Sequence, residues 1–296
     1  MRPRPVVCVG ALHIDAKARL AGDLIPGTSN PAAVTRTLGG VACNVARSLV
    51  RLGVPVSLVS VIGDDDVGHR LLGRAALEGV GVDEVVVLPG SATAGYTAVL
   101  EKSGSLAFGI ADMAIYESFG ADIIERALRH HRGAIWFVDA NPAADALEAM
   151  GAVDDDLALD PVSIAKARRL LPLLAKAAVA FPDAGEAEAL TGIAHPGTAA
   201  KELVAAGVGV AVVTLGLDGV VVADATGERT RPAIAPKTVR DVTGAGDALI
   251  AGYLAAWSRG EADPVGWGLA AASLTIETLD TVRDDLTLEM LRARMG

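Results

Sequence analysis

The residue types best suited to chemistry lie together in the turn Gly244-Ala245-Gly246-Asp247, which is followed by the apolar residues 248–254. A glycine-rich turn that opens a helix directs free backbone N–H groups and the positive end of the helix dipole at one point. Such a pocket stabilises the negative charge that spreads over a phosphoryl group during its transfer. Asp247, at the helix start, could accept the proton of an attacking hydroxyl group. The same residues could form only a tight turn with a helix-capping aspartate, but Asp241 and Thr243 upstream and the apolar helix downstream favour a phosphoryl-transfer site.

A second glycine pair, Gly39-Gly40, precedes a segment with helical periodicity that contains Asn44 and is expected to end at Gly53. The apolar stripe of this segment consists of Ala42, Val45, Ala46, Leu49 and Leu52. Glycines let the backbone approach a ligand closely, and the Asn44 side chain offers a donor and an acceptor, which suit a sugar hydroxyl group. Taken alone, the motif also fits an ordinary turn followed by a surface asparagine.

Asp15 follows the first strand-like run, after Gly10. In an open α/β sheet, ligands bind beyond the carboxyl ends of the strands, and a carboxylate at that place can hold two hydroxyl groups. The alternative for this residue is a turn or surface aspartate.

Composition and charge argue against several classes of protein. The 296 residues are 51% apolar but only 3% aromatic, so Val-rich strands and Ala/Leu-rich helices can build a large core. The net charge of −10, without any Lys/Arg run, argues against nucleic-acid binding. No apolar stretch has the length of a membrane span, and no signal peptide pattern precedes the first strand-like run. Cys8 and Cys43 do not form a disulfide framework and are typical of a reduced, cytoplasmic protein.

The elements that must position these residues alternate between strands and helices. Near-continuous apolar runs are typical of strands that are buried on both faces of a parallel sheet. Such runs occur at residues 6–9, 56–62, 134–138, 177–181 and 210–213. Helical patterns lie between them, for example at residues 44–52 and 164–174. The alternation predicts a doubly wound α/β fold with a mostly parallel central sheet.

Two segments interrupt this alternation. Strand-like runs on either side of Lys102-Ser103-Gly104-Ser105 form the pattern of a β-hairpin. Residues from about 12 to 38 also lack helical periodicity. We expect a single domain over residues 1–296, in which the segments 12–38 and 91–113 form a small β-rich lid.

The order and separation of the two glycine motifs resemble the PfkB, or ribokinase-like, carbohydrate kinase family. The segment Thr214-Leu215-Gly216-Leu217-Asp218-Gly219 is similar to the strand and turn on the nucleotide side of that family, so the resemblance extends over essentially the whole chain. It implies a ribokinase-like three-layer α/β/α sandwich with a β-rich lid. It also implies phosphoryl transfer from ATP to an alcohol group, with Mg²⁺ and K⁺ as cofactors.

Within that family, further segments resemble the pseudouridine kinases. They are Gly27-Thr28-Ser29-Asn30-Pro31, residues 110–117, Val138-Asp139-Ala140-Asn141, residues 160–166 and Asp241-Val242-Thr243-Gly244. The segments fall in the lid and along the carboxyl edge of the sheet, where the substrate is selected. The resemblance implies phosphorylation of the 5′-hydroxyl group of a nucleoside, with pseudouridine as the substrate. Ribose, another nucleoside or a ketose stays open, because substrate preference can depend on a few lid residues.

The family resemblance implies roles for individual residues. Asp247 would be the catalytic base for the 5′-hydroxyl group, and the anion hole would consist of Gly244, Ala245 and Gly246. Substrate contacts are implied for Asp15, Asn30, Gly39, Gly40, Asn44, Asp112 and Lys166. Nucleotide contacts are implied for Thr214, Gly216, Gly219 and Thr243. Asp241 would lie near a site for a monovalent cation.

One motif departs from the family pattern. The family carries Asn-x-x-Glu after a strand, which organises Mg²⁺ and phosphate through water, whereas this chain has Asp183 and Glu186 at those positions. Asp183 adds a negative charge and lacks the two amide donors of asparagine, so it could bind hydrated Mg²⁺ or repel the triphosphate. Glu186 taken alone fits a carboxylate at a helix N-terminus. Repulsion of the triphosphate would leave a non-catalytic nucleoside- or sugar-binding protein, but the retention of Asp247 and the complete glycine turn favours an enzyme.

Two further expectations concern partners and a rival class of enzyme. The exposed strand edges of a small lid favour pairing with a second copy, so we expect a homodimer through the lid. A dinucleotide-dependent oxidoreductase is disfavoured, because no G-x-G-x-x-G motif follows the first strand and Gly10 is succeeded by Ala11-Leu12-His13.

Overall fold

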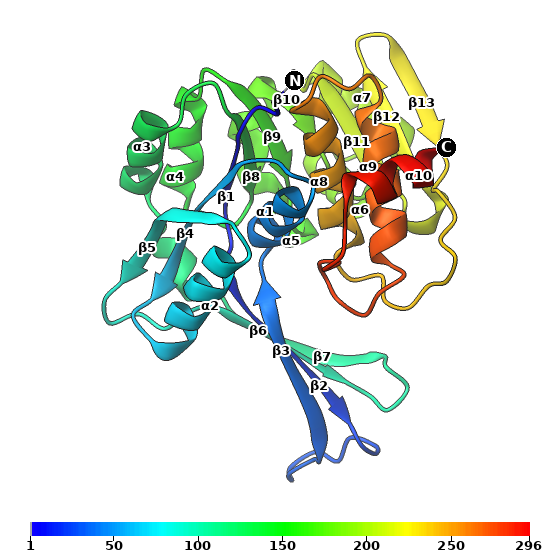
Figure 1. The fold of residues 1–296 in the computed structure, drawn as a ribbon. Coiled ribbons are helices and arrows are strands. Elements are labelled where there is room, and N and C mark those ends of the chain that lie inside the picture. Colours follow the sequence, from blue (N-terminus) through cyan, green and yellow to red (C-terminus); the bar gives the residue numbers. More distant parts are fainter. Residues whose placement is uncertain (1) are drawn as a thin grey trace.

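The structure is a computed structural model that describes residues 2–296. It contains a nine-stranded sheet with helices on both faces and a separate four-stranded sheet (Figure 1). In spatial order, the strands of the large sheet are β13 (Gly227–Arg231), β12 (Val220–Asp224), β11 (Val210–Thr214), β10 (Ala177–Ala180), β9 (Asp156–Asp160), β8 (Ile135–Asp139), β1 (Val6–Val9), β4 (Val56–Gly63) and β5 (Gly81–Leu88). The α-helices are α1 (Val41–Arg51), α2 (Asp66–Leu77), α3 (Ala121–His130), α4 (Ala144–Ala149), α5 (Ile164–Ala167), α6 (Ala184–Thr191), α7 (Pro196–Ala205), α8 (Ala245–Trp257), α9 (Pro264–Thr275) and α10 (Leu288–Met295).

Strand pairing in the large sheet is parallel from β5 to β11 and antiparallel for β11–β12 and β12–β13. A strand that is covered on both faces needs apolar side chains at successive positions. In β1, Val6 and Cys8 belong to one hydrophobic core and Val7 and Val9 to the other, and none of the four is exposed to solvent. The expected α/β fold with a mostly parallel central sheet is therefore confirmed.

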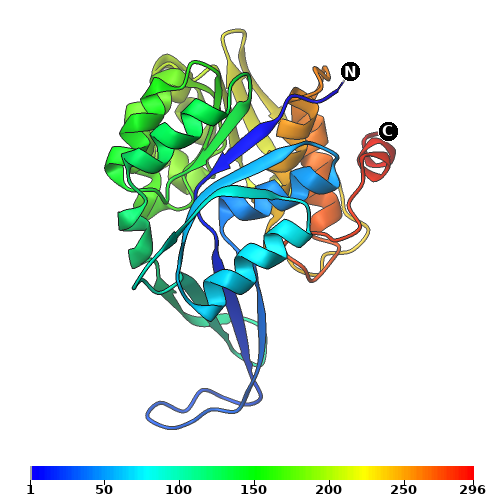
Figure 2. The same ribbon diagram turned by 60° about the vertical axis from the view of Figure 1, so that its left-hand side comes forward.

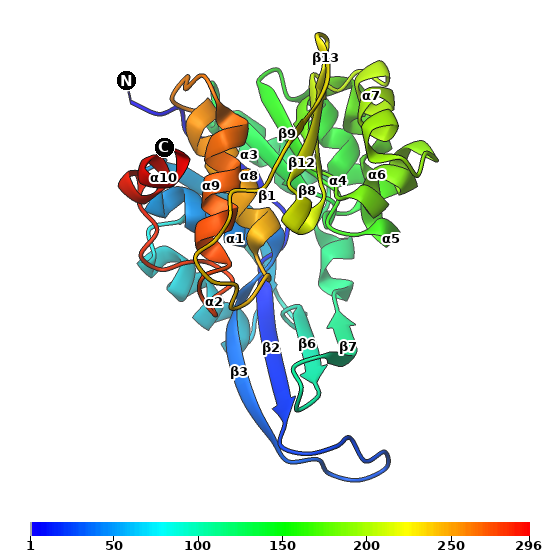
Figure 3. The same cartoon turned by 90° about the vertical axis from the view of Figure 1, so that its right-hand side faces the viewer.

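The two cores lie on opposite faces of the large sheet. Helices α1, α2, α8, α9 and α10 contribute to one core, and α3, α4, α6 and α7 contribute to the other. Figure 3 shows α8, α9 and α10 on one side of the strands and α6 and α7 on the other. The two cysteines, Cys8 and Cys43, are free and fully buried, and burial raises the pKa of the Cys43 thiol to about 12. Three layers with helices outside and strands inside are the sandwich that the sequence predicted.

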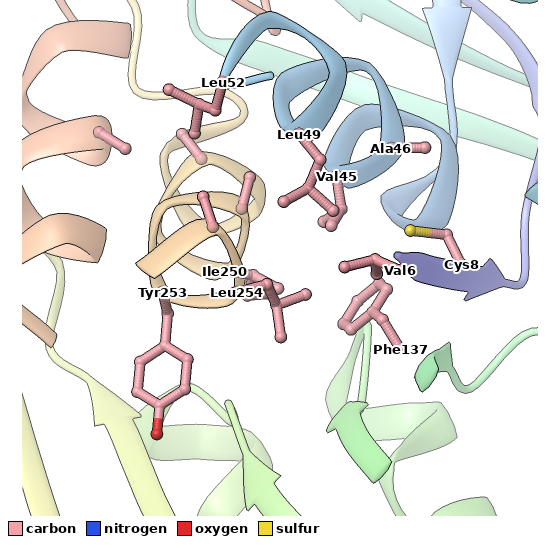
Figure 4. Packing of buried hydrophobic residues seen from close by; sticks show 14 of the residues in the cluster. Val6, Cys8, Val45, Ala46, Leu49, Leu52, Phe137, Ile250, Tyr253 and Leu254 are labelled. Carbon is pink, nitrogen blue, oxygen red and sulfur yellow. The ribbon is translucent and has the colours of Figure 1, made fainter. Parts of the chain in front are cut away.

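Helix α1 packs against α8 along the stripe that was read from its sequence. Every residue of that stripe is fully buried, and the helix is followed by Gly53, which adopts a φ of 69°. Figure 4 shows Val45 and Leu49 of α1 pointing toward Ile250 and Leu254 of α8. This contact fixes the first turn of α1 relative to the first turn of α8.

Truncation of Leu49 is expected to destabilise the protein strongly. Leu49 has no exposed surface, so Leu49→Ala removes buried methyl groups and leaves a cavity, which costs about 3 kcal/mol of unfolding free energy. Leu77, on α2, is 86% exposed, and Leu77→Ala is the matched control. Urea unfolding of both variants measures the difference. Equal losses of stability would contradict the packing of α1 against α8.

The helix predicted at residues 164–174 is only partly α-helical. Helix α5 is short, and the chain continues as a 3-10 helix over Arg168–Lys176 that contains Pro172. Proline has no N–H group to donate and clashes with the preceding turn of an α-helix, so the tighter 3-10 geometry takes over. The apolar spacing was read correctly, since Leu170, Leu173 and Leu174 are buried.

The second sheet, called the lid sheet below, projects from the carboxyl edge of the large sheet (Figures 1 and 2). Its spatial order is β3 (Ala32–Gly39), β2 (His13–Leu20), β6 (Gly95–Leu100) and β7 (Leu106–Asp112). Strands β2 and β6 pair in parallel, and the outer pairs are antiparallel. These strands come from the two segments in which a β-rich lid was expected. Within residues 2–296, no helix has both the length and the apolar character required for a membrane span.

Candidate active site

The N-terminal turns of α1 and α8 meet beside the base of the lid sheet, and this contact brings Asn44 to Asp247. The Asn44 Nδ2 atom donates a hydrogen bond to Asp247 Oδ2 at 2.8 Å. The Asn44 side chain is buried, and its Oδ1 atom has no hydrogen-bond partner within residues 2–296. A buried acceptor without a donor is costly in a folded protein, so this atom is well placed to receive a hydroxyl group from a ligand.

The proton affinity of Asp247 is tuned by its surroundings. Burial raises the pKa of its carboxyl group to about 7, the negative charges of Asp139 and Asp15 also raise it, and the hydrogen bond from Asn44 opposes the rise. A general base works best when its pKa lies near the operating pH. Asp247 is therefore suited to accept a proton at neutral pH.

Gly39 and Gly40 allow Asp15 and the first loop to come close to α1. A Cβ atom at Gly39 would lie 2.3 Å from Asp15 Oδ2, and a Cβ atom at Gly40, where φ is 100°, would lie 2.2 Å from the Ala11 carbonyl oxygen. Asp15 Oδ1 lies 3.1 Å from His13 Nε2, which orients the carboxylate. These two glycines are thus needed for close packing of the protein on itself beside the site.

Asp139, which was not among the site residues expected from the sequence, connects three segments beside the site through hydrogen bonds. It is fully buried at the end of β8, and its Oδ2 atom accepts the backbone N–H groups of Ala11 and Ala42 at 2.9 and 3.1 Å. Its Oδ1 atom accepts both the backbone and side-chain N–H groups of Asn141 at 2.9 Å. A Cβ atom at Gly10 would collide with this carboxylate at 2.1 Å. The sequence signal that could have identified this position is an aspartate at the carboxyl end of a buried strand.

Replacement of Asp139 by asparagine is expected to lower the unfolding free energy by about 3 kcal/mol, because an amide NH₂ group would then face backbone donors. Urea unfolding measures the loss. Asp122→Asn, at an exposed position of α3, is the matched control. Equal stability of the two variants would show that the Asp139 carboxylate does not hold this network.

A large, mostly apolar cavity of about 590 Å³ lies beside the first turn of α8. The expected nucleotide residues Thr214 and Gly216 line it, together with Ala245 and Gly246. Its apolar wall includes Leu217, Ile234, Val239, Val242, Leu249 and Ile276. A flat heteroaromatic base with a few hydrogen-bonding groups suits such a cavity.

Gly219 and Thr243, the other two residues expected at the nucleotide, do not line this cavity. Gly219 has a φ of 102°, and a Cβ atom there would lie 2.1 Å from the Arg231 carbonyl oxygen, so its role is to make the turn before β12. Thr243 donates its backbone N–H and its hydroxyl group to Asp241 Oδ1, at 2.9 and 2.6 Å.

A second, acidic cavity of about 230 Å³ adjoins the first. Thr214 and Gly246 line both cavities. The carboxylates that line the second cavity are Asp160, Asp183, Glu186 and Asp247. The pKa of the Asp160 carboxyl group is raised well above its ordinary value by burial and by the charges of Glu186 and Asp247. A phosphate chain that starts from the apolar cavity would pass Gly246 and enter the acidic one.

Asp183 and Glu186 cap helix α6 and also face the acidic cavity. Asp183 Oδ1 accepts the Glu186 N–H group at 2.7 Å, and Glu186 Oε2 accepts the Asp183 N–H group at 2.8 Å, which is a reciprocal capping box. Burial, together with the charge of Asp183 and against the hydrogen bond from the Asp183 backbone, raises the pKa of Glu186 to about 7. Within residues 2–296, no group of three or more His, Cys, Asp or Glu side chains is placed to hold a metal ion directly. Two carboxylates, each with one oxygen outside the capping box, fit a Mg²⁺ ion that keeps its waters and binds mainly to phosphates.

Asp241 does not fit the expected monovalent-cation site. The ammonium group of Lys17, on β2, already donates to Asp241 Oδ2 at 2.9 Å, and Thr243 occupies Oδ1. Burial alone would raise the pKa of Asp241, but the hydrogen bonds from Thr243 and Lys17 outweigh it and hold the pKa below its ordinary value. A second cation beside the lysine would be repelled, so the expectation of K⁺ at this carboxylate is corrected.

Within residues 2–296, the remaining expected substrate residues make no side-chain hydrogen bond to Asp247. Asn30 lies in the loop at the far end of the lid sheet, where its side chain bonds to the backbone of Ile25 and Thr28. Asp112 is exposed at the end of β7. Lys166 donates to Asn141 Oδ1, next to Asp139, and burial lowers its pKa. Lys166 therefore belongs to the network behind the site, whereas Asn30 and Asp112 lie on the lid.

Comparison with known proteins places this geometry in a family. The family model described as "pfkB family carbohydrate kinase" matches residues 4–287. The chain is 31% identical to pseudouridine kinase of Escherichia coli over 96% of this chain and 94% of that protein. It is 32% identical to fructoselysine 6-kinase of Escherichia coli over 81% of this chain and 89% of that protein. A carbohydrate kinase from Agrobacterium tumefaciens has a solved structure that superposes with a TM-score of 0.85, at 31% identity, over 99% of this chain and 97% of that one.

These matches cover both glycine motifs and the lid, and they decide between an enzyme and the non-catalytic binding protein that Asp183 had left open. These relatives are named as kinases, and in this chain Gly244 and the first turn of α8 carry the glycines and the Asp247 carboxylate that phosphoryl transfer needs. The chain belongs to the PfkB family of carbohydrate kinases and is an ATP-dependent phosphotransferase that acts on a hydroxyl group.

Proposed function

We propose that this kinase phosphorylates the 5′-hydroxyl group of a nucleoside and that pseudouridine is its substrate. The observation that carries the proposal is the Asp247 carboxylate, which Asn44 holds in the acidic cavity next to Gly246, where the apolar cavity adjoins it. The relative named pseudouridine kinase, which is similar over nearly the whole chain, supports the choice of substrate. The enzyme is proposed to be cytoplasmic.

In the proposed reaction, Asp15 and the unpaired Oδ1 atom of Asn44 bind ribose hydroxyl groups and orient the 5′-hydroxyl group toward Asp247. Asp247 takes the proton of that hydroxyl group, and the 5′ oxygen forms a bond to the γ-phosphorus of ATP. The bond between the γ-phosphorus and the β–γ bridging oxygen breaks, and ADP leaves. The backbone N–H groups at the start of α8 stabilise the charge on the transferred group. The lid sheet excludes water from the site.

Mg²⁺ would be held by ATP phosphates and, through its waters, by Asp183 and Glu186, and it would supply charge neutralisation on the phosphate oxygens. The lid sheet would also make the homodimer. Its strand β7 exposes Leu106, Phe108 and Ile110, which a second copy would cover. Light scattering after size-exclusion chromatography measures the oligomeric state.

The substrate assignment is tested by ADP release with Mg-ATP in the presence of pseudouridine, uridine, cytidine, adenosine, ribose or fructose. Pseudouridine is expected to give the highest kcat/KM, and ³¹P NMR of the product should show a 5′-phosphomonoester. A ketosamine such as fructoselysine belongs in the panel, because a relative that is 32% identical carries that activity in its name. Faster turnover of another nucleoside would overturn pseudouridine as the substrate, and faster turnover of ribose, fructose or fructoselysine would overturn the nucleoside class, while the protein would remain a kinase.

The pH dependence of the reaction tests the role of Asp247. Its carboxyl group has a pKa of about 7, so the basic form is lost as the pH falls through that value. We expect kcat/KM to fall about tenfold per pH unit below the pKa and to be flat above it. Steady-state kinetics from pH 5.5 to 8.5 measure the profile. A flat profile over that range would contradict general-base catalysis by Asp247.

A further inference from the structure

Lys17 connects the lid sheet to the loop that carries the anion hole. It lies on β2, two residues after Asp15, so both side chains leave the same face of the strand. Its Nζ atom is 2.9 Å from Asp241 Oδ2 and 3.4 Å from Thr243 Oγ1. The contact spans 224 positions of the sequence, and both side chains are about one-third exposed, at 32% and 27%.

The loop from Asp241 to Gly244 is held from two sides. On one side, the N–H group of Arg240 donates to the Ile276 carbonyl oxygen at 2.8 Å. On the other side, Lys17 neutralises the Asp241 carboxylate, whose second oxygen is used by Thr243. Gly244 follows at once with a φ of 81° and opens α8. Lys17, a residue of the lid sheet, therefore supplies the positive charge that balances Asp241 in the loop before the anion hole.

The sign of that charge matters for the nucleotide. The chain has a net charge of −10, and the acidic cavity already holds four carboxyl groups. An uncompensated carboxylate at Asp241 would repel phosphate groups and would need a cation beside it. The Lys17 ammonium group meets this need, and it does so without taking an ion from solution.

We propose that Lys17 takes the place of a monovalent cation at Asp241, so that this kinase binds nucleotide and turns over independently of K⁺. The inference rests on the proposed kinase site but not on the identity of its substrate. Lys17 acts as a positioning residue, because it touches the loop of the anion hole and not the reacting atoms. This role is tested by asking whether replacement of Lys17 makes nucleotide binding depend on cations. Loss of a lysine with a purely structural role would not create such a dependence.

The experiment compares KCl, NaCl and choline chloride at one ionic strength. The dissociation constant of the magnesium complex of a non-hydrolysable ATP analogue is measured by calorimetry, and ADP release is measured in parallel. For the natural chain, the dissociation constant is expected to differ by less than about twofold among the three salts, and so is the rate of ADP release. In Lys17→Met, we expect affinity to fall about tenfold in choline chloride and to recover in KCl, as the ion enters the vacated place. Lys17→Arg should keep the independence, because it retains the charge.

Lys102→Met is the matched control, since Lys102 lies in the turn between β6 and β7 and forms no salt bridge or side-chain hydrogen bond within residues 2–296. Stimulation of the natural chain by KCl of more than about fivefold would overturn the proposal. It would also be overturned if Lys17→Met bound nucleotide as Lys102→Met does, or if KCl did not reverse its loss. Should no nucleoside be phosphorylated, the proposed substrate fails, while nucleotide affinity in the three salts still decides on Lys17.

Discussion

Asp247→Asn is expected to lower kcat by about 10³-fold while the protein remains folded. The amide keeps the shape of the side chain, and its oxygen can still accept the hydrogen bond from Asn44 Nδ2, which measures 2.8 Å in the natural chain. The variant cannot accept the proton of the substrate hydroxyl group. Removal of a partly buried carboxyl group whose pKa is about 7 leaves packing unchanged and eliminates the base.

The measurement is single-turnover phosphoryl transfer, with thermal unfolding to show that the fold is retained. Asp183→Asn is the matched control, because the same substitution is made in the same acidic cavity. Its side-chain oxygen can still accept the Glu186 N–H group and keep the cap of α6, so we expect activity equal to or above that of the natural chain. If Asp247→Asn kept more than about a tenth of the activity, another group would have to be the base.

Gly246→Ala is expected to separate activity from stability. A Cβ atom at Gly246 would meet no protein atom within 4 Å, so the fold can accept it. Alanine in the first turn of a helix should stabilise the protein by about 0.5 kcal/mol relative to glycine. The same methyl group would enter the space where the apolar and acidic cavities meet. We expect kcat/KM for ATP to fall about 100-fold, because the phosphate chain would be displaced.

Two other glycines provide the controls for Gly246→Ala. Gly73, in α2, also has no atom within 4 Å of the place that a Cβ methyl group would take, and Gly73→Ala should change neither activity nor nucleotide affinity. Gly244→Ala should lose both activity and stability, because its Cβ would lie 2.0 Å from the Thr281 carbonyl oxygen at a φ of 81°. A Gly246→Ala variant that keeps full activity would show that the phosphates do not pass this residue.

The sequence predicted the layers of the fold well, because burial on both faces of a strand leaves a direct trace in its composition. The runs at residues 6–9 and 210–213 became β1 and β11 with little change. The predicted runs did not include the internal strands β9 and β12 or the edge strands β5 and β13. Strand β13 has the sequence Gly-Glu-Arg-Thr-Arg and is mostly exposed, so its pairing with β12 decides its conformation.

The site was predictable where a motif is local and unpredictable where a contact joins distant segments. Gly244 to Asp247 and Gly39 to Asn44 are local motifs, and the fold brings their helices together. The pairing of Lys17 with Asp241 and the network around Asp139 depend on which strand lies beside which loop. No spacing rule within one segment encodes such a pair. The resemblance of Asn30 and Asp112 to family positions identified lid residues, but it did not give their distance from Asp247.

The burial of Cys8 and Cys43 makes the enzyme convenient for spectroscopy. Neither thiol is exposed, and a thiol whose pKa lies near 12 forms almost no thiolate at neutral pH, so maleimide reagents should leave the folded chain unlabelled. New cysteines can then be labelled without removing the native ones. Thr28→Cys at the tip of the lid and Gly73→Cys on α2 are both at exposed positions. A fluorophore pair at these two places would report, in real time, how far the tip travels when ligands bind.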